Sequence, residues 1–193
     1  MKVEERTDVQ AGHEAADWHS LVPRLLTDHG SRRVAEVGVW KGELSRRILA
    51  CSQIEHLTLV DPWEVVYGKS EDGRYLVFGP GLSQSEMTDS FMEVHAMAKI
   101  HRDRVTILRL PSTGGASIIP DGSLDAVIID ALHTYHACKE DILAWWPKLR
   151  PGGLMIGDDM SEWFPGVQIA VEEVFGAKYK ALGQTWWIIK EGA

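Results

Sequence analysis

Two apolar segments that each end in acidic residues constrain the fold of this chain more than any other feature. Residues 124–130 (LDAVIID) and 154–159 (LMIGDD) are apolar runs that stop on aspartate, and a segment with helical periodicity lies between them at 138–149. Continuous apolar runs bounded by turn residues are typical of parallel strands that are covered on both faces. Ligands of open α/β sheets bind outside the carboxyl ends of the strands. The terminal acids therefore indicate a site at that edge.

The rest of the chain alternates short apolar runs with helical periodicity, which predicts one α/β domain over residues 1–193. Strands are expected at 34–39, 57–60, 105–110 and 185–190, and helices at 12–29, 43–50, 84–101 and 167–175. Pro23 should break the first helix or lie in its first turn. Residues 67–80 are expected to form a loop, and residues 111–115 a turn. Within residues 62–101 we expect an insertion that acts as a lid or substrate wall, or as decoration.

Composition excludes several classes of function. The formal charge of −8 argues against nucleic acid as a partner, because a phosphate-binding protein needs a basic face. No apolar run approaches the roughly 20 residues of a membrane helix, and no secretory segment follows Met1, so no membrane association is expected. Two cysteines, Cys51 and Cys138, do not make a disulfide framework, which favours the cytoplasm.

The ends of the first two strands favour a nucleoside site. Gly38 lies between strand and helix in the segment EVGVWKG, where a glycine lets the backbone approach a ligand closely. An ordinary turn with positive φ would explain this glycine equally well. Asp61 ends the second strand, where an acid can accept hydrogen bonds from both ribose hydroxyls, although aspartate before Pro62 also begins turns. The pattern G-x-G-x-x-G is absent, so a dinucleotide site is a poor match.

The acids at the predicted edge suit a metal ion. Asp130, Asp158 and Asp159 supply hard oxygen ligands of the kind that Mg²⁺ or Mn²⁺ prefers, and without a cation their mutual repulsion would raise at least one pKa. A helix cap or turn is the alternative role for the adjacent pair. His133 could be a general base or could form a structural hydrogen bond. A set of His133, His136 and Asp130 could hold Fe²⁺ or Zn²⁺, but it leaves the adjacent pair without a role.

From about Val34 to Lys190 the chain resembles class I S-adenosylmethionine-dependent methyltransferases, in particular the small metal-dependent O-methyltransferases. The matching segments are EVGVWKG, LVDPW, LRLPS, IIDALHTYHACKEDILAWWPKLRPGG and LMIGDDM. The last two are the most specific, and they are similar to a run found in sugar and macrolide-sugar O-methyltransferases. The resemblance implies a Rossmann-like, seven-stranded, mostly parallel sheet with helices on both faces and the last strand antiparallel.

The resemblance also assigns residues to the cofactor. Those that it places around S-adenosylmethionine are Glu36, Gly38, Asp61, Trp63, Ser112 and Asp130. Glu36 and Gly38 would line the methionine end, and Asp61 would hold the ribose hydroxyls. Ser112 and Trp63 would lie near the adenine.

The metal and catalytic roles follow in the same way. The residues implied as ligands of Mg²⁺ (or Mn²⁺) are Asp130, Asp158 and Asp159, and His133 would take the proton of the acceptor hydroxyl. Three protein ligands leave room for two substrate oxygens, which predicts a vicinal diol or a similar chelating acceptor. Ala131 replaces the usual glycine, and Asp159 stands where catechol enzymes carry asparagine. Both departures favour sugar acceptors over catechols.

The sequence therefore predicts a cytoplasmic O-methyltransferase that uses S-adenosylmethionine and Mg²⁺ to modify a small-molecule hydroxyl, with a saccharide as the expected acceptor and a homodimer as the expected assembly. A catechol-type or other natural-product O-methyltransferase is one alternative. A hydroxylase with a methyltransferase fold and a non-catalytic binding module are others, whereas a nicotinamide-dependent oxidoreductase lacks its glycine fingerprint. Trp40, Trp63 and Trp163 could stack on sugar faces or serve only in packing.

Overall fold

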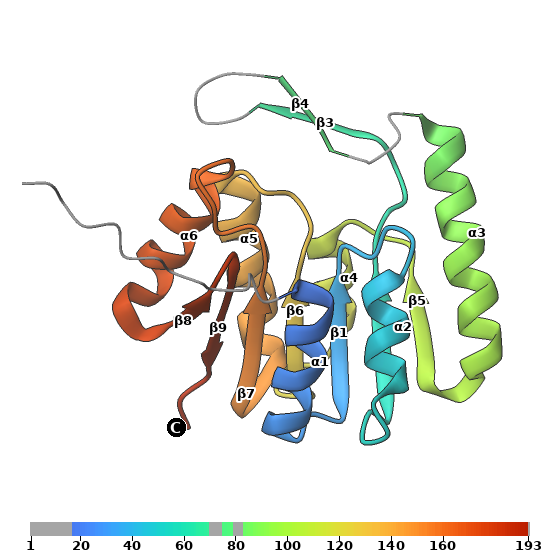
Figure 1. Ribbon diagram of the computed structural model, residues 1–193, viewed down its shortest axis with the longest axis horizontal. Coiled ribbons are helices and arrows are strands. Elements are labelled where there is room, and N and C mark those ends of the chain that lie inside the picture. The colour runs from blue at the N-terminus through green and yellow to red at the C-terminus, as the bar shows by residue number, and fades with distance from the viewer. Residues whose placement is uncertain (1–16, 70–74, 79–82, 193) are drawn as a thin grey trace, which may run out of the picture.

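The computed structural model describes residues 17–69, 75–78 and 83–192 as an α/β sandwich of three layers (Figure 1). The strands of the central sheet are β1 (Arg33–Val37), β2 (His56–Val60), β5 (Val105–Leu108), β6 (Leu124–Ile129), β7 (Leu149–Gly157), β8 (Lys180–Leu182) and β9 (Thr185–Ile189). The helices are α1 (Trp18–His29), α2 (Glu43–Ala50), α3 (Gln84–His101), α4 (Ser112–Ile118), α5 (Tyr135–Trp145) and α6 (Pro165–Phe175). Short 3₁₀ turns are η1 (Arg102–Arg104), η2 (Trp146–Lys148) and η3 (Gly176–Lys178).

The sheet confirms the predicted topology. Its seven strands lie in the order β5-β2-β1-β6-β7-β9-β8, and the last strand, β9, is antiparallel to both of its neighbours. The registers bring the strand ends level, because Val37 pairs with both Val60 and Ile129, and Ile129 pairs with Gly157. Residues that follow these four strands are therefore delivered to one edge of the sheet.

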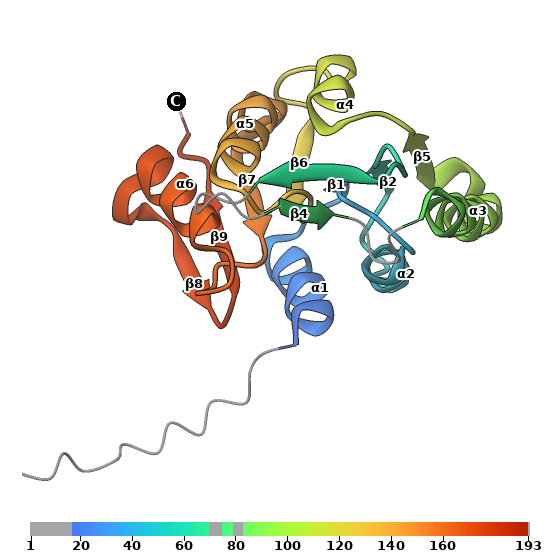
Figure 2. The same ribbon diagram turned by 90° about the horizontal axis from the view of Figure 1, so that it is seen from above.

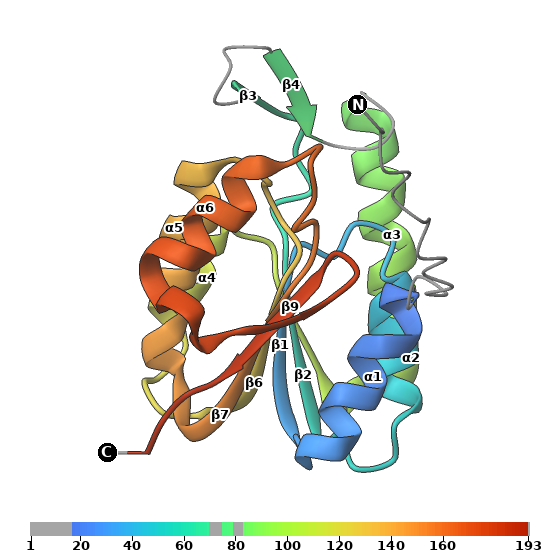
Figure 3. The same cartoon turned by 60° about the vertical axis from the view of Figure 1, so that its left-hand side comes forward.

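Helices cover both faces of the sheet, α1 to α3 on one side and α4 to α6 on the other (Figure 3). The central strands are apolar on both faces for this reason, as their unbroken apolar runs predicted. Leu57 and Ile128 point to the first helical layer, whereas Val127 and Met155 point to the second. Full burial of each such side chain is worth about 1.5–3 kcal/mol, so the two cores hold the edge rigid.

Two of the local predictions for helices and turns were wrong. Pro23 lies inside a continuous α1 rather than at a break, because it removes only one helical hydrogen bond while Leu21 and Leu26 anchor the helix in the core. Residues 111–115 were expected to be a turn, but Ser112 begins helix α4. One glycine of the pair that suggested a turn has a packing role, since a Cβ on Gly115 would lie 2.4 Å from a Val60 methyl group.

The segment predicted as a loop at 67–80 contains an antiparallel hairpin of β3 (Val66–Lys69) and β4 (Tyr75–Phe78). Its valine, tyrosine and phenylalanine residues favour strands despite the surrounding glycines and prolines. Residues 70–74 and 79–80 of that segment, and 12–16 of the first expected helix, lie outside the described residues. Strand β8 was not predicted.

The insertion at 62–101 has two parts with different surroundings. Helix α3 belongs to the first helical layer, and it buries Met87, Val94 and Met97 in the core. The β3–β4 hairpin instead lies across the carboxyl edge of the sheet (Figure 2). That the hairpin serves as a lid stays a prediction.

Among the described helices, none combines the length and apolarity that crossing a membrane requires.

Candidate active site

A cavity of about 970 Å³ opens at the carboxyl edge of the strands. Its walls come from the segments that follow β1, β2, β5, β6 and β7 and from helices α1, α2, α3 and α5. The predicted site residues that line it are Glu36, Gly38, Asp61, Ser112, Asp130, His133, Asp158 and Asp159. The fold thus brings together residues that are up to 123 positions apart in the chain.

Gly38 is required by the neighbouring strand. Its φ is +84°, and a Cβ at this position would lie 1.8 Å from the carbonyl oxygen of Asp130. The amide of Asp130 donates to the carbonyl of Val37 over 2.8 Å, which closes the contact between the ends of β1 and β6. The glycine therefore allows the loop that begins at Asp130 and the end of the first strand to meet.

Asp61 organises two loops at once. Its Oδ2 accepts hydrogen bonds from the amides of Val39 and Trp40 over 2.9 Å and 3.0 Å, and its Oδ1 accepts one from the amide of Trp63 over 2.6 Å. A carboxylate has about four acceptor positions, so roughly one remains for a ligand hydroxyl. This side chain is therefore a structural element of the site as well as a candidate ribose ligand.

The three candidate stacking tryptophans occupy different environments. Trp63 is completely buried behind the cavity, where its indole Nε1 donates to the carbonyl of Trp40 and its ring packs on Phe91. Trp40 is 39% exposed and lines the cavity. Trp163 is highly exposed and is not among the lining residues. Of the three, only Trp40 lies where a ligand in the cavity could contact it.

Glu36 is a buried acid in the cavity wall. Its Oε2 accepts a hydrogen bond of 2.6 Å from the hydroxyl of Ser45 on α2. Burial, and then the charges of Asp130 and Asp61, raise the pKa of Glu36 to about 8. A carboxyl group in this state favours a cationic or hydrogen-bond-donating ligand group beside it.

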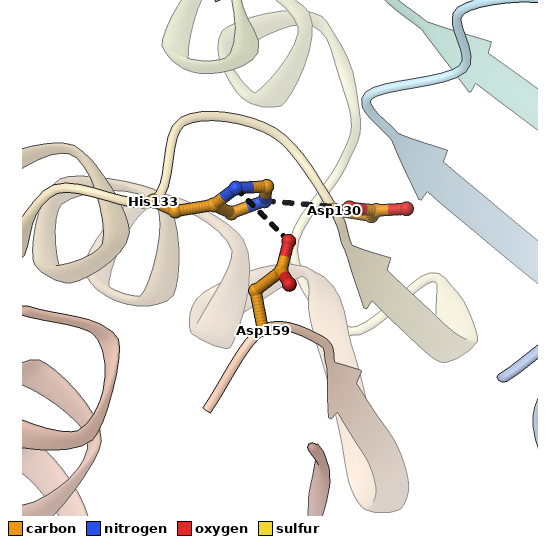
Figure 4. A group of neighbouring side chains, drawn as sticks. All are labelled: Asp130, His133 and Asp159. Carbon is orange, nitrogen blue, oxygen red and sulfur yellow. Dashed lines mark ion pairs between the residues drawn. The ribbon is translucent and has the colours of Figure 1, made fainter. Parts of the chain in front are cut away.

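His133 lies between two of the acids (Figure 4). Its Nδ1 is 3.0 Å from Oδ2 of Asp159, and its Nε2 is 3.4 Å from Oδ1 of Asp130. The ring of Phe164 packs edge-on against the imidazole, with centroids 4.9 Å apart. Asp159 reaches this position through a left-handed backbone with φ of +58°, which is unfavourable for a residue other than glycine. Such strain is typical of functional sites.

The pKa values of the residues in this cluster are shifted by the proximity of three acids and by burial. Burial, and then the charge of Asp130, raise the pKa of Asp158 to about 7. Burial also raises the pKa of Asp159, although the positive charge of His133 opposes this. For His133, burial would lower the pKa, but Asp130, Asp159 and Asp158 outweigh it and raise the pKa above 6.5. The site is thus short of positive charge.

One donor atom from each of Asp130, His133 and Asp159 lies within 4.8 Å of the others, a grouping that could hold a metal ion. Asp158 lines the same cavity but is not part of this group. The predicted ligand set with Asp158 therefore stays a prediction. His136 is exposed and lines an adjoining groove on α4 and α5 rather than this cavity, and it is not grouped with His133 and Asp130.

Sequence reasoning missed one buried acid that lines the cavity. Asp141 is buried on α5, at three- and four-residue spacing from the buried Cys138 and Trp145. An acid on the apolar face of a predicted helix is the signal that could have identified it. Trp18 and Glu43 also line the cavity, but nothing in their sequence context marks them.

A family model described as "Methyltransferase domain" matches residues 35–160, more than half of the chain. The chain belongs to this methyltransferase domain family. S-adenosylmethionine is the cofactor expected of a methyltransferase domain, and the matched range contains every strand end that lines the cavity. No curated protein matches the chain by sequence.

Solved structures share the fold of this methyltransferase domain. A protein from Klebsiella pneumoniae assigned as an O-methyltransferase has a TM-score of 0.63 at 16% identity, over 95% of this chain and 83% of that chain. One from Staphylococcus aureus assigned as a caffeoyl-CoA O-methyltransferase has a TM-score of 0.61 at 18% identity, over 89% and 82%. The O-methyltransferase NovP has a TM-score of 0.60 at 17% identity, over 88% and 76%. At these identities, the likeness shows the fold alone.

Proposed function

We propose that this chain is an S-adenosylmethionine- and Mg²⁺-dependent O-methyltransferase whose acceptor is a small molecule with two neighbouring hydroxyl groups, such as a sugar or glycoside. The observation that carries the proposal is the cluster of Asp130, His133 and Asp159 in the wall of the cavity of a methyltransferase domain. The two aspartates supply oxygen ligands for a cation, and the histidine supplies a base that can take the proton of a hydroxyl group.

The cavity residues fit the cofactor. Asp61 has acceptor capacity left for a ribose hydroxyl. Glu36 would accept a hydrogen bond from the ammonium group at the methionine end. The positive charge of that group would offset the effect of burial, which raises the pKa of Glu36. When bound, S-adenosylmethionine supplies a methyl group that its sulfonium makes electrophilic.

The donor set also fits a divalent cation. Asp130, Asp158 and Asp159 would hold Mg²⁺ (or Mn²⁺), in keeping with the raised pKa of Asp158 beside Asp130. When bound, the ion would lower the proton affinity of the acceptor hydroxyl and offset the negative charge that raises the pKa of His133. The geometry favours one alternative, in which His133 is itself a ligand, and an imidazole nitrogen suits Zn²⁺ or Fe²⁺ better than Mg²⁺.

His133 is oriented to move a proton. Asp159 holds its Nδ1, and Phe164 fixes the plane of the ring. The Nε2 atom is buried, and its closest described acceptor is Oδ1 of Asp130 at 3.4 Å, too long for a well-formed hydrogen bond. We assign to Nε2 the role of taking the proton of the acceptor hydroxyl. Trp40 provides an exposed aromatic wall for the acceptor at the cavity.

A methyl-transfer assay tests the proposal. The full chain would be supplied with S-adenosylmethionine and a panel of glycosides, catechols and their mono-hydroxyl analogues, with Mg²⁺, Zn²⁺ or EDTA. We expect transfer to vicinal diols with Mg²⁺, none with EDTA, and a loss of about 10²-fold or more in kcat for His133→Ala. His136→Ala, at an exposed histidine that does not line the cavity, is the matched control and should retain activity. Full turnover in EDTA, or an active His133→Ala variant, would overturn the mechanism.

A further inference from the structure

The last residue of β7, directly before the two acids, is a glycine whose missing side chain makes room for the neighbouring strand. Gly157 pairs with Trp186 of β9, and both residues are buried. A Cβ on Gly157 would lie 2.3 Å from Cε2 and from Cζ2 of the Trp186 indole, and 2.5 Å from its Nε1. The indole ring therefore occupies the space that a side chain at this position would fill.

This contact removes freedom from the backbone where the site needs a fixed geometry. Glycine has the greatest backbone freedom of any residue, and Asp158 and Asp159 follow Gly157 immediately. The ring that limits this freedom is itself held in place. Trp186 is 1% exposed, and it packs in the core of the second helical layer with the ring of Phe175 at a centroid distance of 6.2 Å.

A hydrogen bond ties the other side of the acid pair to the same hairpin of β8 and β9. The amide of Met160 donates to the carbonyl of Gln184, in the turn between these strands, over 2.9 Å. The acids are thus held between one contact at the residue before them and another at the residue after them. The left-handed backbone of Asp159, which is uncommon for a residue other than glycine, lies between these two contacts.

We propose that Trp186 is a positioning residue for the divalent cation. Its indole ring fixes Gly157, and through Gly157 it fixes the direction in which Asp158 and Asp159 present their carboxylates. Trp186 does not itself line the cavity, so it acts on the cation only through these neighbours. The inference rests on the cation of the proposed function, and it adds a residue from outside the cavity to the site.

The indole itself suggests the variant that tests this role. Trp186→Phe lacks the fused second ring and leaves a gap beside Gly157, but it loses no hydrogen bond, because no described residue bonds to Nε1. Electron paramagnetic resonance of free Mn²⁺ would measure the Kd of Mn²⁺ for the full chain. We expect Kd to rise about tenfold in Trp186→Phe, as is typical when support behind a metal ligand is removed. Trp187→Phe, one residue along β9 and in contact with the opposite helical layer, is the matched control and should keep the native Kd.

A second pair of variants tests whether the ring acts through Gly157. Gly157→Ala alone places a methyl group inside the indole ring, so it should weaken Mn²⁺ binding or prevent folding. The φ of Gly157 is not positive, so the backbone itself accepts alanine. In the double variant Trp186→Phe/Gly157→Ala the methyl group fills the gap, and Kd should fall below that of Trp186→Phe. Urea unfolding establishes that each variant is folded under the conditions of the binding measurement.

The comparison of metal affinity with folding separates positioning from support of the core. If folded Trp186→Phe binds Mn²⁺ as the native protein does, or if Trp187→Phe weakens binding equally, Trp186 serves only the fold and the inference is wrong. A double variant that binds Mn²⁺ no better than Trp186→Phe also contradicts it. If the native protein does not bind Mn²⁺, the metal dependence of the proposed function fails, and the inference fails with it. Should Trp186→Phe not fold, the double variant decides, because a native Kd supports the inference and a raised one overturns it.

Discussion

Replacing Glu36 with glutamine should stabilise the free protein at neutral pH. The pKa of Glu36 is raised from 4.5 to about 8 in the folded state, so folding requires this group to bind a proton at pH 7. Because the folded pKa of an acid is raised, the penalty is absent well below pH 4.5 and grows as pH rises toward 8. Each pKa unit corresponds to about 1.4 kcal/mol, which gives a penalty of about 1 kcal/mol at pH 5 and about 3 kcal/mol at pH 7.

Urea unfolding of native protein and Glu36→Gln, followed by tryptophan fluorescence at pH 5 and pH 7, measures this effect. The free energy of unfolding of the variant, relative to the native protein, should rise by roughly 2 kcal/mol between the two pH values. The free-energy cost of burying the glutamine amide is the same at both pH values, so it cancels in this comparison. The Ser45 hydroxyl still has an acceptor in the variant. The exposed Glu93→Gln on α3 is the control. If the free energies of unfolding of the variant and the native protein differ by the same amount at both pH values, the account of Glu36 is refuted.

Three further outcomes follow from the geometry of the site. Gly38→Ala should prevent folding or lower the free energy of unfolding by more than about 3 kcal/mol, since its Cβ would overlap the Asp130 carbonyl, whereas Gly30→Ala, with positive φ but free space, should lose only about 1 kcal/mol in thermal or urea unfolding. Asp61→Asn places an amide N–H₂ against backbone donors, and it should cost about 2 kcal/mol in urea unfolding and weaken calorimetric binding of S-adenosylhomocysteine. Burial raises the pKa of Cys138 to about 12, so its thiol should resist alkylation at pH 8 until the protein unfolds, as peptide mass spectrometry would show.

The edge of the sheet was predictable because a local pattern determines it. The apolar runs of β6 and β7 stop on Asp130 and on Asp158, and parallel pairing then places their ends level, as the register of Ile129 with Gly157 confirms. The helices could be predicted from hydrophobic periodicity, because that too is a local pattern. Strand β8 was not predicted because it is three residues long and exposed, which leaves no apolar pattern to detect.

The details of the site depend on tertiary contacts that no local pattern encodes. The left-handed backbone of Asp159, an uncommon conformation for a residue other than glycine, turns its carboxylate to His133. The complete burial of Trp63 against Phe91 of α3 is another such contact, and its predicted place near the adenine stays a prediction. Asp141 could be found only by asking why an acid lies among apolar positions of α5.

The central claim is that the acids at the ends of β6 and β7 hold a divalent cation beside the cofactor. The most direct test is the anomalous difference density of a crystal grown with Mn²⁺ and S-adenosylhomocysteine. We expect one strong manganese peak in contact with the carboxylates of Asp130 and Asp159, in the same cavity as the nucleoside. A crystal in which S-adenosylhomocysteine is bound but manganese is absent, or lies away from these carboxylates, would contradict the account.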